Sequence, residues 1–459
     1  LYYWDASIGV QPVSCTLSIA SPCVVTPYPG YTFTNGMAIR LKTTGALPTG
    51  LSAGTTYFVV NATSSTFQLS ATYGGAAINT SGTQSGTQYV DCRGIPLTAI
   101  GDSSTPTVQN SMTISDTSRF VIVFGTNDYG STVLDPMLIR WSDQENYAVW
   151  YPQATNQAGS IRLSHGSEIV TVVQSRQEIV VFTDSSVYSM QYIGPPYVWS
   201  TQLLGDNTSI AGPNAAALAS GVTYWMGRDK FYMYDGRVQV LNCDLRKYVF
   251  SDINLVQQEQ IFCGTNEGFN EVWWFYCSEN STTVDKYVIF NYLERCWYYG
   301  TIARTAWMDS GLLPYPIAAD YNKRLLNHEH GVDDVATGTV LPIEAYISSS
   351  EFDINDGHNF GFVWRALPDL SFEGSTEGSS PELVMTLYPL RNSGSGVGTA
   401  ESATVSGTGT PYTITENFTG QVYTRVRGRQ LIFKVSSNKV GTTWQFGSPR
   451  FDIKPDGRR

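Results

Sequence analysis

The densest group of potential metal ligands is His328-Glu329-His330, in a chain with only four histidines. On a strand, His328 and His330 would share one face, because side chains alternate, and the two imidazoles could begin a zinc-type site. No third ligand is evident, and Gly331 follows directly. A turn is therefore the stronger interpretation of His328 and His330, and we expect no metal and no cofactor.

Carboxylates offer a second possible chemistry, because glycoside hydrolysis uses two carboxyl groups that face each other across a pocket. The sequence does not place any two of its acidic residues together. Several of them precede Gly, Ser or Lys in segments typical of turns, where Asp is common. We therefore predict that the protein is not an enzyme. The acidic residues considered are Asp143, Glu145, Asp184, Asp235, Glu267, Glu271 and Glu294.

Seven widely spaced cysteines form no C-x-x-C pair, so the sequence does not support a zinc ribbon or thioredoxin-like chemistry. Cys263, Cys277 and Cys296 have apolar or aromatic neighbours and are typical of small core residues. This usage predicts assembly in a reducing cytoplasm.

The basic residues gather near the C-terminus. Arg425, Arg427 and Arg429 alternate along VYTRVRGRQLIF, so a strand there would present all three on one face. Such a stripe would hold DNA if it faced nucleic acid, or it would strengthen an assembly if it met carboxylates of another protein. The other members of this cluster are Arg450, Lys454, Arg458 and Arg459.

Composition points to an all-β protein. Only 15% of the 459 residues are charged, whereas 13% are aromatic and Gly counts 42, which favours many turns and a large protein–protein interface. The net charge of −11 argues against a general nucleic-acid binder. The longest apolar run is Val272–Cys277, so no membrane span is expected. Leu1 is not an initiator methionine, and we expect the chain to begin inside a domain.

Three aromatic-rich blocks suggest the main architecture: Ile169–Gly205, Gly221–Leu241 and Asn270–Gly300. Each contains a short strand, a tight turn and another strand, with aromatics near its close, as in propeller blades. We predict a β-propeller over residues 1–12 and 91–339, with five or six blades and a helix at Ser251–Gln260.

Two further β segments accompany the predicted propeller. Residues 13–90 are rich in Thr, Ser and Gly, and strands at Thr55–Val60 and Thr66–Ala71 flank a turn at Asn61–Ser65. We predict that this segment is a small β module inserted in a propeller loop. Longer strands follow residue 340, and they predict a C-terminal β-sandwich or platform domain over 340–459.

Several stretches resemble the tail nozzle proteins (tail tubular protein B, or stabilisation protein) of short-tailed bacteriophages. The likeness covers roughly Asp116–Arg459, and the inserted module is similar to a small β domain that recurs in phage tail proteins. The stretches include QEIVVFTDSSVYSMQYIGPPYVWSTQLLGDNTSIAGPNAAALASGVTYWMGRDKFYMYDGRV, NEGFNEVWWFYCS, YVIFNYLERCWYYGTIARTAW and FGSPRFDIKPDGRR.

The resemblance implies a virion tail protein, assembled in the host cytoplasm, that forms a homohexameric ring around a DNA channel. It implies a dodecameric tail adaptor above the ring and tail fibre or tailspike proteins as further partners. An acidic ring would let DNA pass without holding it. On this view Arg425, Arg427 and Arg429 make a subunit or adaptor contact, while the channel-lining residues stay unknown. The alternative is a receptor- or glycan-binding tail protein with a propeller platform.

Overall fold

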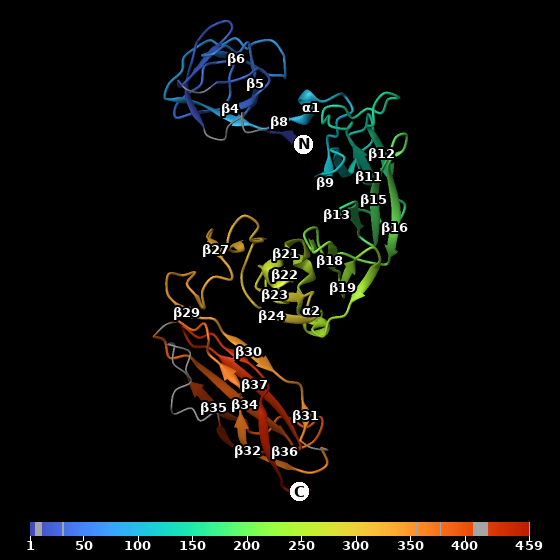
Figure 1. The fold of residues 1–459 in the computed structure, drawn as a ribbon. Coiled ribbons are helices and arrows are strands. Elements are labelled where there is room, and N and C mark those ends of the chain that lie inside the picture. The colour runs from blue at the N-terminus through green and yellow to red at the C-terminus, as the bar shows by residue number, and fades with distance from the viewer. Residues whose placement is uncertain (5–11, 30–31, 355–356, 377, 407–420, 459) are drawn as a thin grey trace. The chain divides into compact units, whose positions relative to one another are not determined.

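The computed structural model describes residues 1–4, 12–29, 32–354, 357–376, 378–406 and 421–458. It is predominantly β, with 47% strand and 5% helix, and it contains many small antiparallel sheets. The predicted all-β class is therefore confirmed. The chain divides into two compact units, Leu1–Leu325 and Leu326–Arg459 (Figure 1).

Four successive four-stranded sheets make up most of the first unit, and in each sheet the strands are neighbours in chain order. Figure 1 shows them from cyan through green to yellow. The first two sheets are β9 (Gln109–Ile114), β10 (Val121–Asn127), β11 (Leu134–Trp141), β12 (Gly159–Arg162), then β13 (Ile169–Gln174), β14 (Ile179–Thr183), β15 (Ser186–Gly194), β16 (Val198–Asp206). The next two are β17 (Ala216–Ala219), β18 (Val222–Met226), β19 (Phe231–Tyr234), β20 (Val238–Leu241), then β21 (Phe262–Asn266), β22 (Glu271–Tyr276), β23 (Lys286–Asn291), β24 (Cys296–Thr301).

The first strand of each sheet lies against the first strand of the next. Contacts link β9 to β13, β13 to β17, β17 to β21, and β21 to β25 (Ala306–Met308). A parallel bridge between Asn214 and Phe262 joins the start of the β17 segment to β21. None of these five first strands contains a charged residue. The sheets therefore meet along a row of uncharged strands.

Tryptophan side chains connect neighbouring sheets. The Trp274 indole Nε1 of β22 donates to the Ala215 carbonyl oxygen at 3.0 Å, next to β17. Likewise, Trp307 Nε1 of β25 donates to the Thr265 carbonyl oxygen of β21 at 2.7 Å. A Cβ at Gly264 would lie 2.4 Å from the Trp307 ring, so the close approach of this indole requires glycine. These bonds satisfy the indole N–H groups and link neighbouring sheets.

A closed six-stranded barrel, blue in Figure 1, precedes these sheets, in the order β2-β3-β6-β5-β4-β7. Its core includes Val25, Leu41, Val59 and Leu69, all fully buried. Outside the barrel, β1 (Tyr2–Tyr3) pairs with β8 (Ile95–Pro96), ahead of the short helix α1 (Leu97–Ile100). The barrel strands are β2 (Val13–Leu17), β3 (Val24–Pro27), β4 (Ala38–Thr43), β5 (Thr56–Val60), β6 (Phe67–Ser70) and β7 (Gln88–Arg93). β5 and β6 match the strands that the sequence predicts.

The predicted helix at Ser251–Gln260 is wrong as a single element. The chain instead forms α2 (Arg246–Asp252) and the 3₁₀ helix η1 (Leu255–Gln260). Ile253 and Asn254 between them are extended, and the Asn254 side chain accepts from the Val256 N–H at 3.1 Å. An Asn N-cap therefore starts the second helix. A further 3₁₀ turn, η2 (Glu267–Phe269), follows β21.

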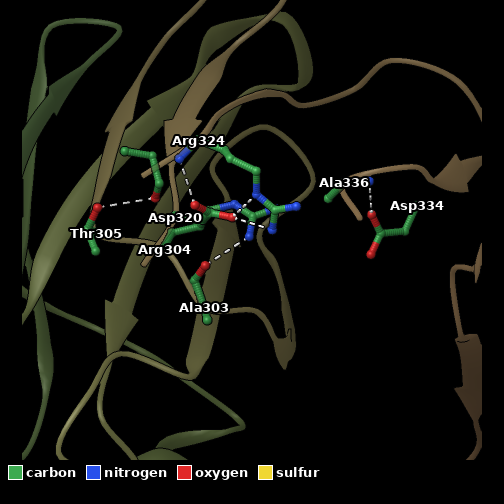
Figure 2. Close-up of polar contacts among 8 residues, drawn as sticks. Ala303, Arg304, Thr305, Asp320, Arg324, Asp334 and Ala336 are labelled. Carbon is green, nitrogen blue, oxygen red and sulfur yellow. Dashed lines mark hydrogen bonds and ion pairs between the residues drawn. The ribbon is translucent and has the colours of Figure 1, made fainter. Parts of the chain in front are cut away.

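The last strands of the first unit are β25 and β26 (Ile317–Ala319), which pair antiparallel. The first unit ends at Leu325, which is also the first residue of β27 (Leu325–Asn327). Figure 2 shows the turn after β26. Asp320 accepts from the Arg324 N–H at 2.9 Å and from Arg324 Nε at 2.8 Å. The nearby Thr305 hydroxyl donates to the Ala319 carbonyl oxygen at 3.3 Å.

Two larger sheets of the second unit share one hydrophobic core that includes Val363, Leu383, Val426 and Val435. One sheet has the order β30-β37-β34-β35, with β31 also on β37, and the other has the order β36-β32-β39. The strands are β28 (Asp333–Asp334), β29 (Leu341–Pro342), β30 (Ala345–Ser348), β31 (Phe352–Asp353), β32 (Gly361–Leu367), β33 (Leu370–Ser371), β34 (Glu382–Leu390), β35 (Glu401–Ser406), β36 (Val422–Gly428), β37 (Gln430–Ser437), β38 (Gln445–Phe446) and β39 (Arg450–Pro455).

The hairpin β28–β29 lies largely ahead of residue 340, yet it is part of this unit. The Asp333 carboxylate accepts the Gly441 N–H at 2.8 and 3.0 Å, which ties the hairpin to the later strands.

Candidate interaction site

The predicted arginine stripe lies on β36 and the turn that follows it. Arg425 and Arg427 are exposed, whereas Thr424 and Val426, which alternate with them along the strand, are buried. Arg429 lies one residue beyond the strand, between β36 and β37. The expectation that a single strand presents all three arginines is therefore corrected: β36 presents two, because the strand ends at Gly428 and Arg429 lies in the bend before β37.

Phe360 brings Arg427 and Arg429 together again. The two guanidinium carbons lie 4.2 and 4.9 Å from the centre of the Phe360 ring. Arg427 also forms an ion pair with Asp456, and Arg429 Nη2 donates to the Arg458 carbonyl oxygen at 3.0 Å. An aromatic ring thus orients two cations at one end of the sheet.

A second aromatic–cation group lies on neighbouring strands of the same sheet. The Trp364 ring has the Arg365 guanidinium carbon at 4.8 Å and Lys454 Nζ at 5.0 Å, and Tyr423 lies 6.3 Å from it. Arg365 is held by an ion pair with Asp452. Sequence reasoning missed Phe360 and Trp364, although the alternating aromatics in HNFGFVW were a signal for an exposed strand face.

The charge of this region differs from that of the rest of the chain. Residues 422–459 carry nine Lys or Arg against two Asp or Glu, although the whole chain has a net charge of −11. Among the ion pairs of the described residues, none involves Arg425, Arg450 or Lys454. The face of β36-β32-β39 therefore combines exposed cations with aromatic rings, which is the composition of a protein–protein contact. We call it the basic sheet face. Arg459 lies outside the described residues.

His328 and His330 lie in the bend after β27, where Glu329 has a left-handed φ of 54°. The strand that would align them is absent at these positions. Within the residues that the structure describes, no group of three or more His, Cys, Asp or Glu side chains is placed to hold a metal ion.

Several of the acidic residues considered for hydrolysis take part in local contacts. Asp184 accepts from the N–H and hydroxyl of Ser167 at 2.8 and 2.6 Å; partial burial raises the pKa of Asp184, but these bonds outweigh it, and the pKa is lowered. Glu145 pairs with Arg119, and Glu271 accepts from Trp273 Nε1 at 3.0 Å. These bonds stabilise turns and strands.

The seven cysteines are free thiols. Burial raises the pKa of Cys15 to about 12 and that of Cys277 to about 11. Thiols with such values are mostly protonated at neutral pH and react slowly.

No family model matches the chain, and no curated protein matches it either. Within the described residues, no helix is long and apolar enough to cross a membrane.

Proposed function

We propose that the protein is a structural virion component that forms the hexameric tail nozzle below the portal adaptor. The nozzle retains packaged DNA and provides the channel through which the genome is ejected. The observation that carries this proposal is the basic sheet face on an otherwise acidic chain, because such complementarity favours association between copies or with an adaptor.

A β-propeller in the first unit is part of the proposal. Its support is the succession of four-stranded antiparallel sheets in which the first strand of each sheet contacts the first strand of the next sheet. In a propeller the innermost strand of every blade faces a common axis. Residues 1–12 and 91–339 would form this propeller, residues 13–90 would be the inserted module, and residues 340–459 would form a β-sandwich platform.

The charge distribution supports passage of DNA without retention. Each phosphate contact would add affinity and friction, and a net charge of −11 per chain opposes such contacts. The proposed partners are five further copies of the chain, a dodecameric tail adaptor, and tail fibre or tailspike proteins. The place of action is the virion tail, after assembly in the host cytoplasm.

Particle mass and symmetry test the proposal. Mass photometry and negative-stain electron microscopy of the purified chain, with and without its adaptor, should show six-fold rings. A chain that stays monomeric even with the adaptor would overturn the proposal. Trimers that bind a glycan array would instead favour a receptor-binding tail protein, for which exposed rings such as Tyr197 and Tyr423 would serve.

A further inference from the structure

A hollow of about 460 Å³ lies between the turn that joins β34 to β35 and the strand β36. Three arginines line it, Arg391, Arg425 and Arg427, together with the single carboxylate Glu401. Leu390 and Val426 form part of its apolar wall. Three guanidinium groups on one hollow make a local excess of positive charge in an acidic protein.

Backbone bonds shape the wall that carries Arg391. The N–H groups of Arg391 and Asn392 donate to Ser395 Oγ at 3.1 and 3.2 Å. Gly398 N–H donates to the Pro389 carbonyl oxygen at 2.8 Å. The turn between β34 and β35 is therefore closed on itself, and Arg391 projects from an ordered segment.

The turn between β36 and β37 is joined to the same wall, because the Arg429 N–H donates to the Leu390 carbonyl oxygen at 2.9 Å. This bond links the end of β34 to the end of β36. Residues about 34 positions apart in the chain, Arg391 and Arg425, consequently line one hollow.

Among the described residues, the carboxylate of the hollow forms no ion pair with the three arginines, and its single charge offsets only part of theirs. Glu401 Oε2 accepts a hydrogen bond from the backbone N–H of Arg425 at 2.6 Å, so this oxygen binds the backbone of β36. Arg427 is oriented by Asp456 and by the Phe360 ring. Arg391 and Arg425 take part in no ion pair among the described residues.

Guanidinium groups bind carboxylates through paired N–H···O bonds of fixed geometry. We infer that this hollow is a carboxylate-binding site that takes acidic side chains from a second copy of the chain. The inference deepens the proposed ring, and it rests on that proposal for the identity of the second copy. It adds Arg391 to the contact and names the chemistry of the group that it receives.

The charges of the chain favour a second copy over nucleic acid as the source of the anion. Residues 1–421 contain 37 Asp or Glu against 19 Lys or Arg, so a neighbouring copy offers many carboxylates. A hollow also suits single side chains, whereas single-stranded nucleic acid is bound along a groove.

The test compares Arg391→Glu/Arg425→Glu with a charge-matched control, Lys247→Glu/Lys439→Glu, whose lysines are exposed and do not line the hollow. Sedimentation velocity in physiological salt measures self-association of the full chain. We expect the hollow variant to associate at least about tenfold more weakly than wild type, and the control to stay within about twofold. Thermal melting checks that both variants fold, and Arg391→Gln/Arg425→Gln replaces the first variant if it does not.

A second measurement identifies the anion. Fluorescence anisotropy with a labelled hexaglutamate peptide and with a labelled thymidine decamer should show binding of the peptide only, lost in the hollow variant. Binding of the decamer that depends on Arg391 and Arg425 would overturn the inference in favour of nucleic acid.

The two proposals fail differently. If the hollow variant forms rings as stable as those of the wild type, the inference is overturned, but the proposed nozzle function is not. A wild-type chain that never self-associates, even with the adaptor, overturns both.

Discussion

Val13 of β2 and Val90 of β7 are register partners in antiparallel strands, so the first and last strands of the barrel lie side by side. Tyr3 and Ile95 are paired just outside them. The chain therefore enters and leaves the barrel at one place, although 76 residues separate the two valines. A domain inserted in a loop needs such close ends.

This geometry predicts the effect of deleting the barrel. Replacing residues 13–90 with a short Gly/Ser linker should leave the rest of the chain folded, because the barrel supplies nearly all of the core in which it takes part, with Ile95 the one buried member outside the deletion. We expect its melting temperature to change by less than about 3 °C, measured by circular dichroism and calorimetry. The isolated segment 12–94 is the matched control and should fold alone. Aggregation of the deletion variant would show that the barrel supports the remaining core.

The contacts of Arg140, which takes no part in the proposed contact, predict an effect on stability. Its side chain is fully buried, and it donates to the carbonyl oxygen of Asn127 at 2.9 Å and to that of Ser104. Its guanidinium carbon lies 4.1 Å from the centre of the Tyr129 ring. Arg140→Met would leave both carbonyl groups without this donor, and we expect the free energy of unfolding to fall by about 2–4 kcal/mol.

Urea unfolding measures this loss. Arg119→Met removes an exposed ion pair with Glu145 and is the control; it should cost less than about 1 kcal/mol. Equal effects of the two substitutions would contradict the argument from burial.

The lowered pKa of Asp320 predicts that the stability of the fold depends on pH. The N–H of Arg324, and then its guanidinium, lower the pKa of Asp320 in the folded chain. A lowered pKa stabilises the fold above the unfolded value, about 3.9, and the stabilisation is lost as the pH falls through the folded value. Asp320→Asn should therefore be less stable than wild type at pH 7, and the difference should shrink below about pH 4.

Urea unfolding of both chains between pH 7 and pH 3 checks the prediction for Asp320. Asp116→Asn is a control for removing a negative charge from the same unit. A difference between wild type and Asp320→Asn that stays constant with pH would exclude the carboxylate as its source.

We expect no hydrolase activity, because several of the acidic residues considered for catalysis are engaged in local bonds, such as that from Ser167 to Asp184. Incubation with host polysaccharide, peptidoglycan and DNA should release no soluble product. Turnover that disappears when Asp143 or Asp184 is changed to Ala would refute this expectation.

Local patterns in the sequence predicted local structure well. The strands around Asn61 follow from alternation and from the residue's left-handed φ of 50°, and both depend on neighbours in the chain. Arg425 and Arg427 share a strand face for the same reason. The helix at Ser251–Gln260 was mispredicted because the extended residues Ile253 and Asn254 interrupt a pattern that is otherwise helical.

Contacts between distant segments were decided only by the tertiary structure. Nothing local in the sequence indicates that Val13 pairs with Val90, or that Phe360 receives Arg427 and Arg429. The hollow lined by Arg391 and Arg425 likewise exists because a hydrogen bond from Arg429 to Leu390 joins two turns. Whether a segment forms a strand, and which face each residue takes, depends on the alternation of residue types over a few positions. The order and register of strands in a sheet depend on which strands, remote in sequence, bury each other's apolar sides.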